Sequence, residues 1–137
     1  MLKEIHRPKK VFSLAEANRT LPLVSRITRD IVRASEAMSR SRARILAFNA
    51  AGRRADAEEE EDRLGAFELE VEGFVEEIEE IGCALKDPAI GLVDFPARVG
   101  GKVVLLCWKM GEPEILYYHD VDAGFAGRKS VRGVFDR

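Results

Sequence analysis

The chain has 137 residues, of which 46% are hydrophobic and 34% are charged, and its formal net charge at pH 7 is −2. This balance is typical of one globular domain and excludes disordered and collagen-like chains. No apolar run in the sequence approaches the roughly 20 residues that span a bilayer. We expect no secretory signal, because the basic N-terminal segment has no apolar run. Two cysteines, Cys83 and Cys107, are too few for a disulfide scaffold, so we expect a cytoplasmic protein.

A helix start is predicted at Ser13. The Ser13 hydroxyl can accept from the amide of Glu16, while the Glu16 side chain can reach back to the Ser13 amide, which is the pattern of a capping box. Pro22 follows about two turns later. Because proline disrupts a helix interior, we expect a short helix over 14–18 and a new helix from about Thr20.

Two long amphipathic helices are predicted next. Apolar residues recur at alternating steps of three and four over 24–48, with Ser41 as the polar exception, and again over 64–85. This spacing indicates an antiparallel coiled-coil hairpin over 21–85, with its loop at 51–55. Burial of the apolar seam between two helices contributes less free energy than the conformational entropy lost by ordering their backbone costs. We therefore expect the seam to need the C-terminal region or a second hairpin in a dimer.

The two helices carry opposite charge. Residues 21–55 contain eight arginines and two acidic residues, whereas residues 56–81 contain thirteen acidic residues and one arginine. Adjacent segments of opposite sign favour two helices that attract each other, although solvated helical faces explain the same pattern.

Extended segments are predicted after Gly82. Apolar runs at 91–95, 102–109 and 114–119 are separated by Gly- and Pro-containing links, which indicates a small antiparallel meander. The middle run is apolar on both faces, so we expect one face to pack on the hairpin and the other to be covered by the tail from Gly124 or by another subunit.

The predicted fold class is therefore α+β, a long antiparallel helical hairpin followed by a small meander sheet. We expect a single domain over 1–137. Its parts are an N-terminal arm and short helix at 1–20, the hairpin at 21–85, and the sheet and tail at 86–137.

Four segments of the chain resemble a known family. They are FSLAEAN at 12–18 with LPLV at 21–24, GLVDFPA at 91–97, LCW at 106–108 with GEP at 111–113, and HDVDAGFAGR at 119–128. Together they resemble the bacterial domain-of-unknown-function family 2203 over about 11–130, with Tyr118 and the pair at 88–89 as departures. The resemblance implies a small cytoplasmic bacterial protein and carries no assigned activity.

Metal-ligand residue types gather around His119. Imidazole combined with carboxylates suits zinc or another first-row divalent ion. An EF-hand is excluded, because Val131 stands where that loop places its closing Glu. The candidate metal ligands are Asp94, Glu112, His119, Asp120 and Asp122. The alternative is that these acids cap the turn and accept from backbone amides and Arg128.

Arg128 and Trp108 are candidate cofactor-binding residues. With His119 they could bound a small anionic ligand, since arginine pairs bidentately with carboxylate or phosphate. The alternative is an internal ion pair between Arg128 and Asp94 or Asp122. Nucleotide hydrolysis has little support, because the segment lacks the Gly-Lys-Ser/Thr ending of a phosphate-binding loop.

No catalytic residue is assigned. Cys107 lies in an apolar strand, where a thiol behaves as a small hydrophobe, and a nucleophilic role would need His119 to face it from the adjacent strand.

Arg19, Arg26, Arg33 and Arg40 recur every seven residues and form a basic line along the first long helix. Such a line can track phosphates. Nucleic-acid binding is nevertheless disfavoured, because no aromatic residues interleave. We also expect acidic residues of the second helix to neutralise the line, namely Glu68, Glu70, Glu72, Glu76 and Glu77.

The leading hypothesis is a non-enzymatic interaction or assembly protein that associates through its hairpin as a homodimer or with a protein partner. The alternative is a metal- or anion-binding protein, or an enzyme, with a site around His119, Asp122 and Arg128. No membrane association is expected.

Overall fold

The first long helix, α2 (Leu14–Ala50), begins as predicted and then runs without interruption. In this computed structural model, which describes residues 10–135, Ser13 and Glu16 form both hydrogen bonds of the capping box. Pro22 lies inside the helix, so the predicted break before Thr20 is wrong. Loss of the Pro22 hydrogen bond costs about 3 kcal/mol, which burial of several large apolar side chains on the same helix outweighs.

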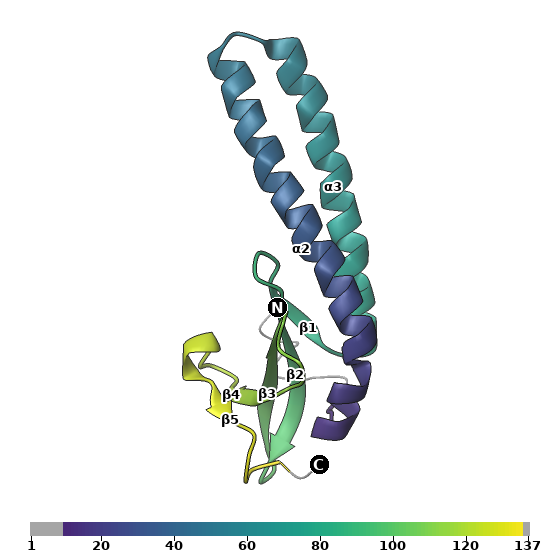
Figure 1. Ribbon diagram of the computed structural model, residues 1–137, viewed down its shortest axis with the longest axis vertical. Coiled ribbons are helices and arrows are strands. Elements are labelled where there is room, and N and C mark those ends of the chain that lie inside the picture. The colour runs from purple at the N-terminus through teal and green to yellow at the C-terminus, as the bar shows by residue number, and fades with distance from the viewer. Residues whose placement is uncertain (1–9, 136–137) are drawn as a thin grey trace.

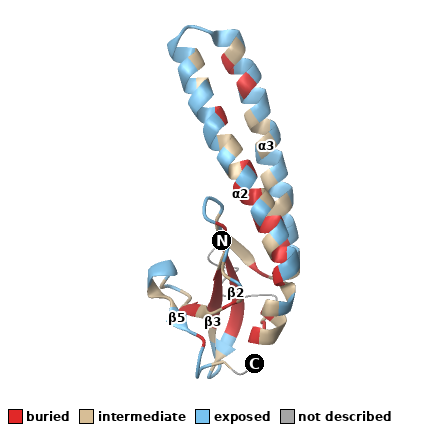
Figure 2. Ribbon diagram, viewed as in Figure 1, coloured by how far each residue is buried: buried red, intermediate tan, exposed pale blue. Residues whose placement is uncertain are grey.

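The second helix, α3 (Arg54–Ile81), returns alongside α2 and completes the predicted hairpin (Figure 1). A short turn containing Gly52 joins them, and Gly82 ends α3 in the left-handed conformation. Burial is greatest near the sheet, where Val24, Ile31 and Ile78 are fully enclosed, whereas the distal half of the hairpin is mostly exposed or half-buried (Figure 2).

Five strands form an antiparallel meander in the order β1-β2-β3-β4-β5. The predicted meander is therefore confirmed, and the two edge strands are additions to it. Leu85 belongs to the first of these edge strands rather than to the helical seam. The elements are β1 (Ala84–Asp87), β2 (Leu92–Val99), β3 (Lys102–Lys109), β4 (Tyr117–Asp120), the 3-10 helix η1 (Phe125–Gly127) and β5 (Lys129–Ser130).

One face of the sheet packs on the hairpin. Val93, Phe95, Leu106 and Trp108 alternate along β2 and β3 and share one core with residues of both helices. Gly91 allows a close approach between α2 and the sheet, since a Cβ built there would lie 2.9 Å from the Thr28 methyl group and 2.8 Å from the Cβ of Met110.

The opposite face of the sheet is buried as well. Leu105 and Cys107 on β3 are 1% and 0% exposed, as expected for a strand that is apolar on both sides. The tail divides between the two faces. Arg128 binds the backbone carbonyl of Cys107, whereas Val131 and Phe135 pack into the core that the helices share.

Within residues 10–135, no helix is both long enough and apolar enough to cross a bilayer.

Candidate metal centre

Three adjacent strands bring Asp94, Cys107 and His119 to one point in the sheet. Asp94 on β2 lies directly opposite Cys107 on β3, and His119 on β4 lies opposite Leu105, two residues from Cys107. Because side chains alternate between faces, the three side chains share the face turned away from the helical core. All three residues are buried, with exposed fractions of 1%, 0% and 2%.

The His119 ring has a partner at each nitrogen. Its Nδ1 lies 2.8 Å from the backbone oxygen of Asp120, and its Nε2 lies 3.1 Å from Oδ1 of Asp94. A carbonyl oxygen only accepts, so Nδ1 carries a proton and donates it. The Nε2 atom therefore faces a carboxylate and needs a second proton or a bound cation there.

The surroundings favour positive charge on His119. Hydrogen bonds to the side chains of Asp94 and then Cys107 raise the pKa of His119 from 6.5 to about 10, against the opposing effect of burial. Asp94 retains an unused acceptor, because its Oδ2 is buried and has no hydrogen-bond partner among the described residues. An unsatisfied buried carboxylate oxygen is costly unless something binds it.

The ligand atoms of these three residues lie near one another. One ligand atom from each of Asp94, Cys107 and His119 lies within 4.8 Å of the other two, and no other such group occurs within residues 10–135. Two ligands about 2.0 Å from a tetrahedral zinc ion lie about 3.3 Å apart, close to the separation between Asp94 and His119.

The remaining predicted metal ligands lie elsewhere. Glu112 accepts two hydrogen bonds from Arg128, at 2.6 and 2.9 Å. The Asp120 carboxylate faces Lys102 at 3.6 Å and Lys129 at 3.4 Å, which lowers the pKa of Asp120. Asp122 is exposed on the turn after β4. The structure thus brings two of the five predicted ligands together and leaves these three outside the cluster.

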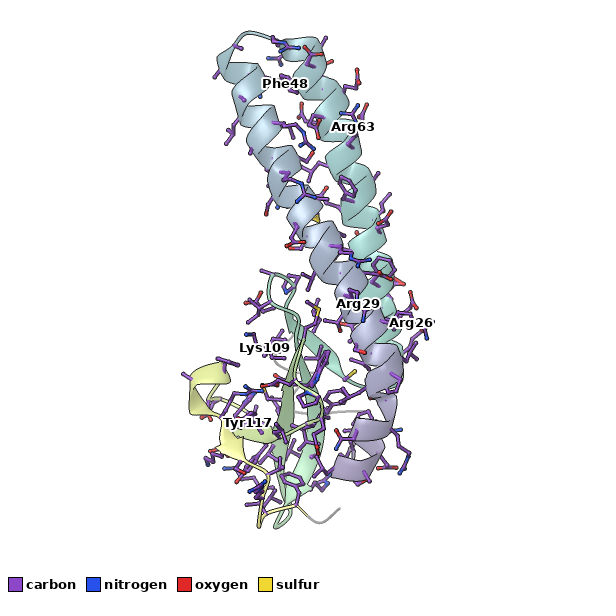
Figure 3. The ribbon with its side chains drawn as sticks, viewed as in Figure 1. Arg26, Arg29, Phe48, Arg63, Lys109 and Tyr117 are labelled. Carbon is purple, nitrogen blue, oxygen red and sulfur yellow. The ribbon has the colours of Figure 1, made fainter. Side chains whose placement is uncertain are left out.

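Arg128 is held by contacts with side chains of the same chain. Its guanidinium stacks on Tyr117 at 4.1 Å and on Phe125 at 4.6 Å, and its ion-pair partner is Glu112 rather than Asp94 or Asp122 (Tyr117 is labelled in Figure 3). Trp108 donates from its indole to the Glu112 backbone oxygen. Glu112 therefore already neutralises the cation that the predicted anion site would use.

Cys107 was not among the predicted metal ligands, although sequence analysis considered it as a nucleophile that His119 would have to face from the adjacent strand. Its apolar neighbours hide it in the sequence, although alternation along β3 separates Cys107 from the core-facing Leu106 and Trp108. The signal that could have found it is the pairing of this strand with the strands that carry Asp94 and His119.

A buried polar layer crosses the distal half of the hairpin. Ser41 donates to Glu60 at 2.6 Å, and Glu60 also accepts from Arg44 at 3.1 Å and from Arg63 at 2.8 Å. Hydrogen bonds, first from Arg44 and then from Ser41, lower the pKa of Glu60 to about 2. Ser41, the polar exception in the predicted apolar repeat of α2, is thus hydrogen-bonded to the Glu60 carboxylate of α3.

The basic line remains largely unneutralised. The ion pairs between α2 and α3 are Arg42–Glu68 at 4.0 Å and Arg44–Glu60 at 3.1 Å. Within the described chain, none of Arg19, Arg26, Arg33 and Arg40 forms an ion pair, so the predicted neutralisation of this line is wrong. The reason is geometric, because the two helices meet through their apolar seam and most of their charges lie outside it.

These features define an α+β protein in which a helical hairpin stands on a meander sheet that holds a buried Asp-Cys-His cluster. The chain belongs to the family described as "Uncharacterized conserved protein (DUF2203)", whose model matches residues 10–131 and so covers the whole cluster. Comparison with curated proteins and with solved structures gave no match.

Proposed function

We propose that this protein binds a divalent transition-metal ion of the zinc type through Asp94, Cys107 and His119. The observation that carries the proposal is the convergence of a carboxylate, a thiol and an imidazole in one buried cluster whose carboxylate keeps an unpartnered oxygen.

The chemistry of the three side chains selects the class of ion. Thiolate and imidazole suit zinc and its first-row neighbours, whereas magnesium and calcium take oxygen ligands. A carboxylate and a thiolate together balance the charge of a divalent cation, so the loaded site carries no net charge into the interior. Three protein ligands leave a fourth tetrahedral position for another ligand.

The orientation of His119 also supports the proposal. Metal-binding histidines commonly donate their second ring N–H to a carbonyl or carboxylate, which holds the ring and its tautomer. The bond from Nδ1 of His119 to the Asp120 carbonyl has this form and leaves Nε2 for the ion.

A nucleophilic Cys107 is less well supported. A relay from thiol to imidazole to carboxylate needs the thiol and the carboxylate at different ring nitrogens. Here Nδ1 is engaged by a backbone carbonyl and Asp94 lies at Nε2, the remaining nitrogen.

Titration of the metal-free protein with Co²⁺ and then Zn²⁺ tests the metal site. We expect one Co²⁺ per chain, a thiolate-to-cobalt charge-transfer absorption, and displacement of Co²⁺ by Zn²⁺. Cys107→Ser, His119→Gln and Asp94→Asn should each weaken binding by more than the ~10- to 100-fold that follows loss of a partner supporting a metal ligand.

Cys83→Ala is the matched control. Cys83 is the other buried free thiol but packs in the core shared with the helices, so its removal should leave the cobalt spectrum unchanged. A folded wild-type protein that takes up neither ion would contradict the proposal. Binding that survives all three ligand substitutions would contradict it equally.

Association through the hairpin is a second candidate function, favoured by a different observation. The hairpin extends far beyond the sheet in Figure 1, and Leu46 and Leu69 on it are 73% and 69% exposed. Sedimentation equilibrium of the full chain, without and with co-purifying proteins, tests this candidate. A monomer that retains no partner would refute it.

A further inference from the structure

We infer that a second copy of this chain covers the basic line of α2 with its own acidic helix α3. The inference rests on the second candidate function and names its partner. The basic line is Arg19, Arg26, Arg33 and Arg40.

The basic line is an extended surface whose four arginines form no ion pair with any residue of 10–135. All four arginines are exposed, and their seven-residue spacing keeps them on one side of a helix over about 32 Å. Figure 3 labels Arg26 and the neighbouring Arg29 on the part of the hairpin nearest the sheet. An unpaired row of this length is able to hold a partner of opposite charge.

Helix α3 has the complementary chemistry. Eight of its acidic residues are exposed and form no ion pair with any residue in the described part of the chain. They are Glu61, Asp62, Glu70, Glu72, Glu76, Glu77, Glu79 and Glu80. Leu69 is exposed among them, so the outer surface of α3 also offers an apolar contact.

Within the described residues of one copy, these two surfaces do not pair with each other. The helices of a single hairpin meet through the seam, and only Arg42 and Arg44 reach across it to Glu68 and Glu60. Two copies related by a twofold axis can place α2 of each against α3 of the other, so that the same contact forms twice.

A nucleic acid fits the surface less well. The arginines could contact phosphates, but the adjacent helix carries thirteen acidic residues and one arginine over 56–81 and would repel a polyanion along the whole line. In the proposed dimer, the carboxylates of α3 in each copy face the arginines of α2 in the other copy.

Sedimentation of the full chain at low and high salt tests the inference. We expect a dimer whose apparent dissociation constant rises at least about tenfold with salt, because exposed charge pairs are screened. Arg33→Glu/Arg40→Glu should give a monomer, and so should Glu72→Arg/Glu76→Arg. Mixing these two variants should restore a dimer, since the opposite charges again face each other.

Arg98→Glu/Arg132→Glu is the matched control, because it reverses two exposed arginines outside the hairpin and should leave the dimer intact. Circular dichroism of each variant reports whether the helices persist. A dimer whose dissociation constant changes neither with salt nor with any charge-reversal variant would overturn the inference. It would not refute association through the hairpin. A monomer under every condition would overturn the inference, and it would overturn association through the hairpin as well if the chain also retains no protein partner. Wild-type retention of RNA or DNA that Arg33→Glu/Arg40→Glu abolishes would assign the line to nucleic acid instead.

Discussion

At the scale of single residues, the unusual group is the imidazole of His119. Its ring is enclosed by Asp94 from β2, Cys107 from β3 and the backbone of Asp120, and these contacts favour a cation at the ring. These contacts would stabilise a proton on the ring in the metal-free protein and a metal ion bound to the ring in the proposed loaded form. The two states differ in what occupies the space between Nε2 and the Asp94 carboxylate.

This environment predicts the pH dependence of the metal-free protein. The folded pKa of His119, about 10, lies above its ordinary value of 6.5, so the stabilisation is complete below pH 6.5 and is lost as pH rises towards 10. Denaturant unfolding between pH 6 and 10 measures this loss, and an NMR titration of the imidazole locates the pKa. His119→Gln should remove that part of the pH dependence, and an imidazole that titrates near 6.5 would contradict the prediction.

Gly91 is a second residue with a specific role. Its φ is +71°, and an added Cβ would meet Met110 at 2.8 Å and the Thr28 methyl group at 2.9 Å. We expect Gly91→Ala to lower the free energy of unfolding by about 1–3 kcal/mol, through overpacking between helix and sheet.

Gly65→Ala is the control for that substitution. Gly65 lies inside α3, where an added Cβ meets no atom within 4 Å, so alanine should raise the free energy of unfolding by about 0.5–1 kcal/mol. Urea unfolding of both variants checks the pair. Equal stability of Gly91→Ala and the wild type would show that the sheet does not approach α2 this closely.

At the scale of elements, the hairpin depends on its polar layer as well as on its apolar seam. Ser41 and Glu60 come from different helices and meet in a buried position through a hydrogen bond of 2.6 Å. A misaligned hairpin would leave the Glu60 carboxylate buried without its partners, which is strongly unfavourable. We therefore expect the layer to favour one register among those that the regular apolar repeat alone leaves open.

The polar layer predicts acid sensitivity of the hairpin. The pKa of Glu60 is lowered from 4.5 to about 2, so its stabilisation is present above pH 4.5 and is lost as pH falls through that interval. We expect Glu60→Gln to be less stable than the wild type at pH 6 and to lose less stability on acidification, as followed by helical circular dichroism during urea unfolding. Glu61→Gln, at an exposed and unpaired neighbour, should behave like the wild type, and identical acid profiles for all three proteins would contradict the prediction.

At the scale of the whole molecule, burial is distributed unevenly. Most of the enclosed apolar residues lie where the helices meet the sheet, while Phe48 and Phe67 in the distal hairpin are half-buried (Figure 2). The molecule thus combines a packed end with a projecting rod. The proposed metal centre lies in the sheet, on the face turned away from the helices, and the proposed dimer surface lies on the exposed sides of α2 and α3, so either proposal can fail without the other.

Much of the architecture was predictable because it depends on local patterns. Apolar periodicity over 24–48 and 64–85 identified the helices, although Leu85 belongs to β1, and Gly- and Pro-containing links identified the meander between 91 and 119. The capping box at Ser13 was predictable for the same reason, since its two partners are three residues apart. For the candidate site, residue chemistry pointed to Asp94 and His119.

Contacts between distant parts of the chain decided the rest. Helix α2 continues through Pro22 because its flanking residues bury apolar surface in the core, and the short edge strands exist because β2 and β4 pair with them. Strand register brings Cys107 to Asp94 and His119, and packing assigns Glu112 to Arg128. Local sequence determined which elements form, because helix and strand periods are properties of neighbouring residues. Only the tertiary structure decided which side chains meet, because strand pairing and burial join residues that the sequence separates.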